Sequence, residues 1–220
     1  MIITIDGPAG AGKSTVARQL ASRLGFAYLD TGAMYRAVAW ACLQRGVDLD
    51  DDAAVVDVAG TIAIGFDGDA VLVDGQNVSG EIRTNEVTAA SRYVAANVAV
   101  REILVQQQRR IAGDTDIVTE GRDQGTVVFP GAKFKFFVTA SPESRARRRQ
   151  QDFAERGETV SLEQILAEQE DRDARDAART VGAMKPAADA LEVDTSEMDA
   201  DAVVERLLRI VGGKPGERHA

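Results

Sequence analysis

Short apolar runs along the chain alternate with longer segments in which apolar residues recur at helical spacing. The run over residues 2–5 stops at Asp6-Gly7, as a buried parallel strand does, and the spacing over 13–24 predicts a helix that Gly25 ends. The same alternation predicts strands over 26–29, 117–119, 134–139 and 191–194, and helices over 33–44, 84–96, 98–112, about 142–155, about 161–178 and about 199–211. This order predicts an α/β fold with a doubly wound parallel sheet of five strands.

Two segments depart from that alternation. Between about residues 61 and 80 apolar residues occupy alternate positions, and Asp67-Gly68-Asp69 and Asp74-Gly75 are turn signals, so this segment predicts a small antiparallel meander. We expect it to belong to an insertion, about residues 61–100, in one domain spanning 1–220. Asp30-Thr31-Gly32 is expected to be a loop, and the tail from Gly212 a frayed end.

Composition excludes several kinds of chemistry. The 220 residues carry 26 Lys+Arg against 35 Asp+Glu, a net charge of −9, with one cysteine, Cys42, and one histidine, His219, beside the C-terminus. Triads that use histidine, His/Cys metal sites and internal disulfides are therefore excluded, and the acidic charge argues against broad binding to nucleic acid. No long apolar run or leader pattern is found, so we expect a cytoplasmic protein that binds no membrane.

The first predicted strand and helix are joined by a phosphate-binding motif. The sequence GPAGAGKS matches G-x-x-x-x-G-K-[ST] in the required strand-loop-helix context, which a plain glycine turn does not need. We expect Lys13 to bridge the β- and γ-phosphates of ATP and Ser14 to ligate Mg²⁺. The expected nucleotide-binding residues are Gly7, Pro8, Ala9, Gly10, Ala11, Gly12, Lys13, Ser14 and Thr15.

A phosphate loop alone does not specify the reaction. The chain has no Asn-Lys dipeptide of the kind that guanine-specific switches carry, and motor and remodelling ATPases are larger, which leaves the small-molecule kinases. Such a kinase must also bind an acceptor and exclude water. The chain has 21 arginines and only five lysines, which favours an anionic acceptor.

Arginines are concentrated in the two helices predicted after the fourth strand. We expect Arg145, Arg148 and Arg149 to act from a lid over about residues 145–160, and Arg147 to face solvent. Further along, Arg172, Arg175, Asp176 and Arg179 are spaced three and four apart and are expected to share a helical face. That face is either a solvated set of Arg/Asp pairs or part of a site that places guanidinium groups on the transferred phosphoryl group.

Gly121-Arg122-Asp123 ends a predicted core strand, where a doubly wound sheet binds its ligands. Arg122 can bind an acceptor phosphate, and Asp123 can accept a hydrogen bond from the exocyclic amine of cytosine, which uracil lacks. The alternative for this segment is a surface turn. Arg36 and Arg101 are further isolated candidates.

These motifs together resemble the bacterial cytidylate kinase family. The matching stretches are residues 3–14 (ITIDGPAGAGKS), 30–36 (DTGAMYR), 78–84 (VSGEIRT), 100–102 (VRE), 121–130 (GRDQGTVVFP), the arginines and aspartates of 172–179, and 186–190 (PAADA). They run in order through almost the whole chain. Residues 121–130 are the most specific to the family.

The resemblance implies a core, an inserted domain that binds the nucleoside monophosphate, and a short lid. It implies that the base is contacted by Thr31, Arg101, Asp123 and Arg179. It also implies that the acceptor phosphate is contacted by Arg36 and Arg122, and the ribose by Arg172 and Asp176. This chain departs from the family pattern at Thr31, where serine is common, and at Arg92, which follows Ser91 and replaces a serine expected to touch the ribose.

We therefore expect a monomeric enzyme that transfers the γ-phosphoryl group of ATP, with Mg²⁺, to CMP or dCMP. Fixed positive charge, from Lys13, Arg145, Arg148, Arg149 and Arg172, would stabilise the reaction in place of a general base. The alternative enzyme is another small kinase that acts on UMP or a different small acceptor. A nucleotide switch or nucleic-acid module is disfavoured because the chain lacks a guanine-specificity element and an aromatic-rich basic surface.

Overall fold

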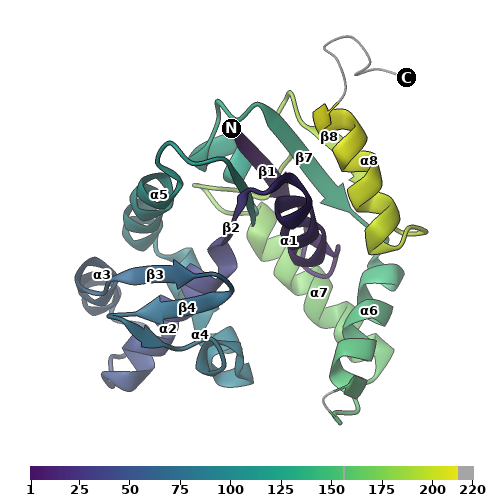
Figure 1. The fold of residues 1–220 in the computed structure, drawn as a ribbon. Coiled ribbons are helices and arrows are strands. Elements are labelled where there is room, and N and C mark those ends of the chain that lie inside the picture. The colour runs from purple at the N-terminus through teal and green to yellow at the C-terminus, as the bar shows by residue number, and fades with distance from the viewer. Residues whose placement is uncertain (156, 213–220) are drawn as a thin grey trace. The chain divides into compact units, whose positions relative to one another are not determined.

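The computed structural model describes residues 1–155 and 157–212 and divides into two compact units (Figure 1). The first unit combines Met1–Leu29 with Asp114–Ala220, and the second is the continuous segment Asp30–Gly113. The insertion expected over about 61–100 falls inside the second unit. The frayed tail expected after Gly212 lies outside the described residues.

The first unit is built on a five-stranded parallel sheet, as the alternation of elements predicts. Its strands are β1 (Ile2–Asp6), β2 (Ala27–Asp30), β6 (Ile117–Gly121), β7 (Phe134–Thr139) and β8 (Leu191–Asp194). Their order across the sheet is β2-β6-β1-β7-β8, so β1 is central, with Ile3 opposite Val118 on one side and Phe134 on the other. Because β1 is central, the loop that follows it lies at the middle of the carboxyl edge.

The first unit has four described helices in addition to the sheet. They are α1 (Lys13–Leu24), α6 (Pro142–Glu155), α7 (Leu162–Ala177) and α8 (Ala200–Gly212). Figure 1 draws α8 beside α1, and the core joins Val16 and Leu20 of α1 with Leu207 of α8 and Phe136 of the sheet. Ser141 and Ser161 cap α6 and α7, because the hydroxyl of each accepts from the backbone N–H group three residues on.

The second unit contains the expected meander together with four helices. Its elements are α2 (Thr31–Gln44), α3 (Asp52–Thr61), β3 (Ile64–Asp67), β4 (Ala70–Val73), β5 (Gln76–Asn77), a 3₁₀ turn (Glu81–Arg83), α4 (Asn85–Ala96) and α5 (Val98–Ala112). The strands form a separate antiparallel sheet in the order β3-β4-β5. The predicted turns at 67–69 and 74–75 are therefore confirmed.

Three details differ from the sequence predictions. Residues 30–32 are not a loop, because the Asp30 carboxylate accepts from the Ala33 N–H at 2.8 Å and starts α2 at Thr31. Helix α3 was not predicted at all. The helical face expected to end at Arg179 is also wrong, since α7 stops at Ala177 and Arg175 is exposed in a pair with Asp171.

None of the described helices is long and apolar enough to cross a lipid bilayer.

Candidate active site

The phosphate loop joins the buried end of β1 to the first turn of α1. Gly7 is needed at its start because its φ is +140° and a Cβ there would lie 1.9 Å from the carbonyl oxygen of Val138. Gly10 and Gly12 also have positive φ, and α1 begins directly after Gly12 with no side-chain cap. The unpaired N–H groups of this helix start are suited to binding a phosphate anion.

Lys13 is buried in this loop, with 5% of its surface exposed, and its Nζ donates to the carbonyl oxygen of Pro8 at 2.7 Å. The pKa of Lys13 is lowered to about 7, mainly by burial and next by the charge of Arg122, while Glu120 acts in the opposite direction. Because burial and the charge of Arg122 destabilise the protonated form of Lys13, a negatively charged ligand would stabilise it.

Ser14 donates a hydrogen bond to Glu120 Oε1 at 2.5 Å, and the Tyr28 hydroxyl reaches the same oxygen at 3.3 Å. Glu120 is buried at the end of β6. A hydroxyl beside a carboxylate is a donor set that suits the hard cation Mg²⁺, which uses few protein ligands and takes the rest from water and substrate phosphates. The described residues contain no cluster of three or more His, Cys, Asp or Glu side chains placed to hold a metal.

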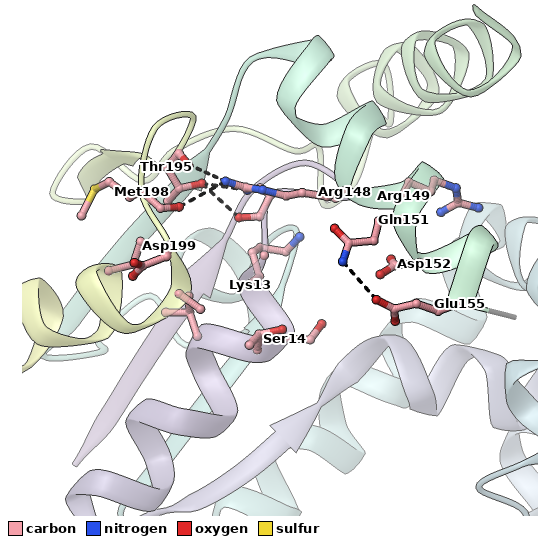
Figure 2. A pocket seen from close by; sticks show the side chains of 17 residues that line it. Lys13, Ser14, Arg148, Arg149, Gln151, Asp152, Glu155, Thr195, Met198 and Asp199 are labelled. Carbon is pink, nitrogen blue, oxygen red and sulfur yellow. Dashed lines mark hydrogen bonds between the residues drawn. The ribbon is translucent and has the colours of Figure 1, made fainter. Parts of the chain in front are cut away.

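A cavity of about 810 Å³ lies beside the phosphate loop (Figure 2). It is lined by residues 10–16 of the loop and α1, by side chains of α6 including Arg148, Arg149 and Asp152, and by residues 195 and 198–200 with Val203. Such a volume accommodates a small organic ligand. The cavity therefore extends the phosphate loop into a space large enough for a small organic ligand.

Arg148 connects α6 to the segment that follows β8. Its guanidinium donates to the Thr195 hydroxyl at 3.2 Å, to the Thr195 carbonyl at 2.5 Å and to the Met198 carbonyl at 3.4 Å, as Figure 2 shows. Thr195 in turn donates to the backbone carbonyls of Ala11 and Thr139. One arginine thus fixes two walls of the cavity to each other.

The other arginines of α6 have different surroundings. Arg145 is buried and donates to the Ala9 carbonyl at 3.1 Å, the Ala140 carbonyl at 3.2 Å and Asp173 at 2.6 Å, so it supports the phosphate loop from α6. Arg149 lies over the Phe153 ring, 5.3 Å from its centre, and lines the cavity. Arg147 is exposed, as expected.

Asp176 joins two of the predicted acceptor arginines. Arg122 Nε donates to it at 2.9 Å and Arg179 pairs with it at 2.6 Å. Burial raises the pKa of Asp176, but the charges of Arg122 and Arg179 outweigh it and hold that pKa below its usual value. Arg172 is half-buried and its charge also acts on Lys13, so these arginines converge near the phosphate loop.

Asp123, the residue predicted to bind the base, is 5% exposed and directly follows Arg122 after the end of β6. The five residues after it, Gln124–Val128, form a π-helical turn that is packed against the sheet, so the segment is not an ordinary surface turn. A buried carboxylate of this kind is costly unless it is hydrogen-bonded.

The remaining predicted acceptor residues lie together in the second unit. Thr31 is buried at the start of α2, and one turn later Arg36 pairs with Asp30 at 3.1 Å. Arg101 of α5 is buried and lies over the ring of Tyr35, 5.7 Å from its centre.

The residues at the family's ribose position also lie in the second unit. Ser91 donates to the Thr88 carbonyl within α4 at 2.8 Å. Arg92 lies over the Tyr93 ring, 5.0 Å from its centre.

Sequence reasoning missed two residues of the site, Glu120 and Thr195. Glu120 had an available signal, because it immediately precedes Gly121 at a strand end. Thr195 had none: its role depends on contacts with Ala11 and Arg148, which are remote in sequence.

Comparisons with known proteins agree on one family. The family model described as Cytidylate kinase matches residues 3–212. The chain is 54% identical to the cytidylate kinase of Rhodopirellula baltica over 211 residues, which cover 96% of this chain and 92% of that protein, and 47% identical to that of Rhodococcus jostii over 221 residues, which cover 98% and 96%.

Among solved structures, the shikimate kinase of Bacteroides thetaiotaomicron matches with a TM-score of 0.51 and 11% identity, and the match covers 96% of this chain and 98% of that one. That likeness supports the kinase fold only. The family model and the two relatives match nearly the whole chain, including the phosphate loop and residues 121–130, and on these grounds the chain belongs to the cytidylate kinase family.

Proposed function

We propose that the protein transfers the γ-phosphoryl group of ATP to CMP or dCMP, giving ADP and CDP or dCDP. The observation that carries the proposal is the placement of Arg122 and Asp123 after β6, in the same unit as the phosphate loop. Family membership supports it, since the two relatives compared above are both named cytidylate kinases.

We assign the acceptor contacts residue by residue. Arg36 and Arg122 bind the acceptor phosphate. Thr31, Arg101, Asp123 and Arg179 bind the base, with Asp123 accepting from the cytosine amine. Arg172 and Asp176 bind the ribose. The arginine pairs with Asp30 and Asp176 support these roles, because Asp30 holds Arg36 in place, and Asp176 holds Arg122 and Arg179, before substrate arrives.

We assign the donor contacts to the phosphate loop, Gly7 to Thr15, and to the cavity beside it. Ser14, with Glu120 behind it, holds Mg²⁺, which supplies charge neutralisation on the donor phosphates. Lys13 and Arg172 stabilise the charge of the transferred group. Arg148 and Arg149 act from the cavity wall, whereas Arg145 acts by holding the Ala9 carbonyl.

The proposed lid spans about residues 145–160, and the proposed acceptor-binding insertion spans about 61–100. We also infer a monomer located in the cytoplasm. The cytoplasmic inference rests on the single cysteine, Cys42, which is buried and therefore suits a reducing compartment.

A monophosphate panel tests the proposed function. Purified protein with Mg²⁺ and ATP is expected to consume CMP and dCMP far faster than UMP, AMP or GMP, measured as ADP release. In the same panel Asp123→Ala is expected to reduce turnover of CMP and leave that of UMP unchanged, because UMP has no amine to donate. Turnover of UMP equal to that of CMP in the unmodified protein would instead favour the alternative, a small kinase with a different acceptor.

Donor binding should also change the protonation of Lys13. Since the pKa of Lys13 is about 7 in the free protein, much of it is neutral near pH 8, and bound phosphates raise that pKa. ATP binding is therefore expected to take up protons. Calorimetric titrations with ATP in buffers of different ionisation enthalpy measure this proton uptake. The Lys13→Met variant should lack the part of the uptake that is due to the lysine. Equal proton uptake by the variant and the unmodified protein would contradict the assignment of the uptake to Lys13.

A further inference from the structure

Asp6 is a buried carboxylate for which the proposed chemistry gives no role. It ends β1, is 5% exposed, and stands immediately before Gly7 of the phosphate loop. Its Oδ1 accepts from the backbone N–H of Gln124 at 2.8 Å, and its Oδ2 accepts from that of Gly125 at 2.7 Å. Both carboxylate oxygens of Asp6 therefore accept hydrogen bonds from a segment that lies more than a hundred residues further along the chain.

The segment held by Asp6 is the π-helical turn Gln124–Val128, which follows Arg122 and Asp123. The first N–H groups of any helical turn lack partners within it, and the Asp123 side chain does not cap this one. Asp6, at the end of β1, supplies the acceptors for the first two N–H groups of this turn. A second contact from the sheet, between the Thr119 hydroxyl and Gln124 Oε1 at 2.9 Å, fixes the same residue.

Close packing at Gly125 shows how tightly the turn is pressed against β1. A Cβ on Gly125 would lie 3.0 Å from the Thr4 hydroxyl oxygen, 3.3 Å from the Lys135 side chain and 3.4 Å from Asp6 Oδ2. An alanine here would require the turn or these side chains to shift by a few tenths of an ångström. Glycine therefore allows the turn to pack closely enough for both hydrogen bonds to Asp6.

The arrangement is kept despite an electrostatic cost. Burial raises the pKa of Asp6 to about 6, while the N–H groups of Gly125 and Gln124 and the charge of Lys13 lower it and the charge of Asp123 raises it. An asparagine would have nearly the same size and no charge to desolvate, but it has only one oxygen to offer two N–H donors. The two hydrogen bonds therefore account for the presence of a carboxylate.

We propose that Asp6 is a positioning residue for the acceptor, which holds the 124–128 turn so that Arg122 and Asp123 keep their placement beside the phosphate loop. The inference rests on the proposed function, because it assumes that these two residues bind cytidylate. Transfer between two bound nucleotides depends on placement to within about an ångström. One side chain next to the donor loop thereby sets the position of the acceptor-binding residues.

The test compares Asp6→Asn with Thr4→Val. Thr4 lies on the same strand and faces the same turn, but its buried hydroxyl has no hydrogen-bond partner, so Thr4→Val serves as the matched control. In Asp6→Asn the new amide N–H₂ faces a backbone N–H, and the turn loses at least one bond. We expect the KM for CMP to rise about tenfold or more, the KM for ATP to stay within twofold, and Thr4→Val to leave both unchanged.

Amide hydrogen exchange at Gln124 and Gly125 provides a readout that does not depend on activity. Asp6→Asn is expected to speed exchange at both amides, and Thr4→Val is not. Gly125→Ala should raise the KM for CMP in the same selective way, because it displaces the turn from the other side, and it carries the test if Asp6→Asn does not fold.

Three results would overturn the inference: unchanged exchange in Asp6→Asn, a KM for CMP within twofold of the unmodified protein, or equal rises in both KM values. If the unmodified protein does not phosphorylate CMP, the proposed function fails, whereas the exchange measurement still decides whether Asp6 holds the turn.

Discussion

Replacing Lys13 with methionine is expected to lower kcat about a thousandfold while leaving the protein at least as stable as the unmodified one. The loss of rate follows because the ammonium group is the fixed charge placed in the phosphate loop, and removal of one such preorganised group typically costs this much. The gain in stability follows because Lys13 is buried and held there by one neutral partner, the Pro8 carbonyl.

The pH dependence of that stability gain can be stated in advance. A lysine whose pKa is lowered by folding, from 10.5 to about 7 here, destabilises the folded state most below pH 7 and not at all above about pH 10.5. The difference in thermal unfolding temperature between Lys13→Met and the unmodified protein should therefore be largest near pH 6. If the variant were both inactive and much less stable, Lys13 would instead be a residue that stabilises the folded state.

Replacing Arg122 with methionine is expected to lower kcat/KM for CMP about a hundredfold. The guanidinium would provide charge-assisted hydrogen bonds to the acceptor phosphate, each worth about 1.5–3 kcal/mol. Its loss also removes one of the two arginines that pair with Asp176, the other being Arg179, so the ribose contact weakens as well. Steady-state kinetics with CMP varied at saturating ATP measures the effect, most of which should appear in KM for CMP.

Arg147→Met is the matched control for that change. Arg147 is exposed on α6, so removing the same charge there should change kcat/KM less than twofold. If Arg122→Met and Arg147→Met were equally active, or if Arg122→Met raised the KM for ATP instead, the assignment of Arg122 to the acceptor would be wrong.

Elements with strong local signals were predictable from the sequence. The five strands of the parallel sheet have apolar runs, four of which end at an aspartate or a glycine. The caps at Ser141 and Ser161 depend only on residues a few positions away. The phosphate loop is equally local, since eight consecutive residues define it. Hydrophobic spacing also located the meander of the second unit.

Features that depend on remote partners were not predictable. The start of α2 at Thr31 is an exception, because the partners of Asp30, which are the Ala33 N–H and Arg36, are close in sequence, but the Asp-Thr-Gly pattern also fits a loop. Arg145 and Arg148 look alike in sequence, yet one binds Ala9 and Asp173 and the other binds Thr195, over separations that spacing on one helix does not reveal. The bonds from Asp6 to the 124–128 turn belong to the same class.

The division into a continuous and a discontinuous unit has a consequence for biosynthesis. Central strand β1 leaves the ribosome before its neighbours β6 and β7, which follow only after the whole of Asp30–Gly113 has been made. Apolar β1 must therefore remain unpaired during translation, while the continuous unit already has all its own strands and helices available. The order of synthesis thus favours folding of the second unit before the parallel sheet closes, and exposes the 2–6 segment to aggregation in the interval.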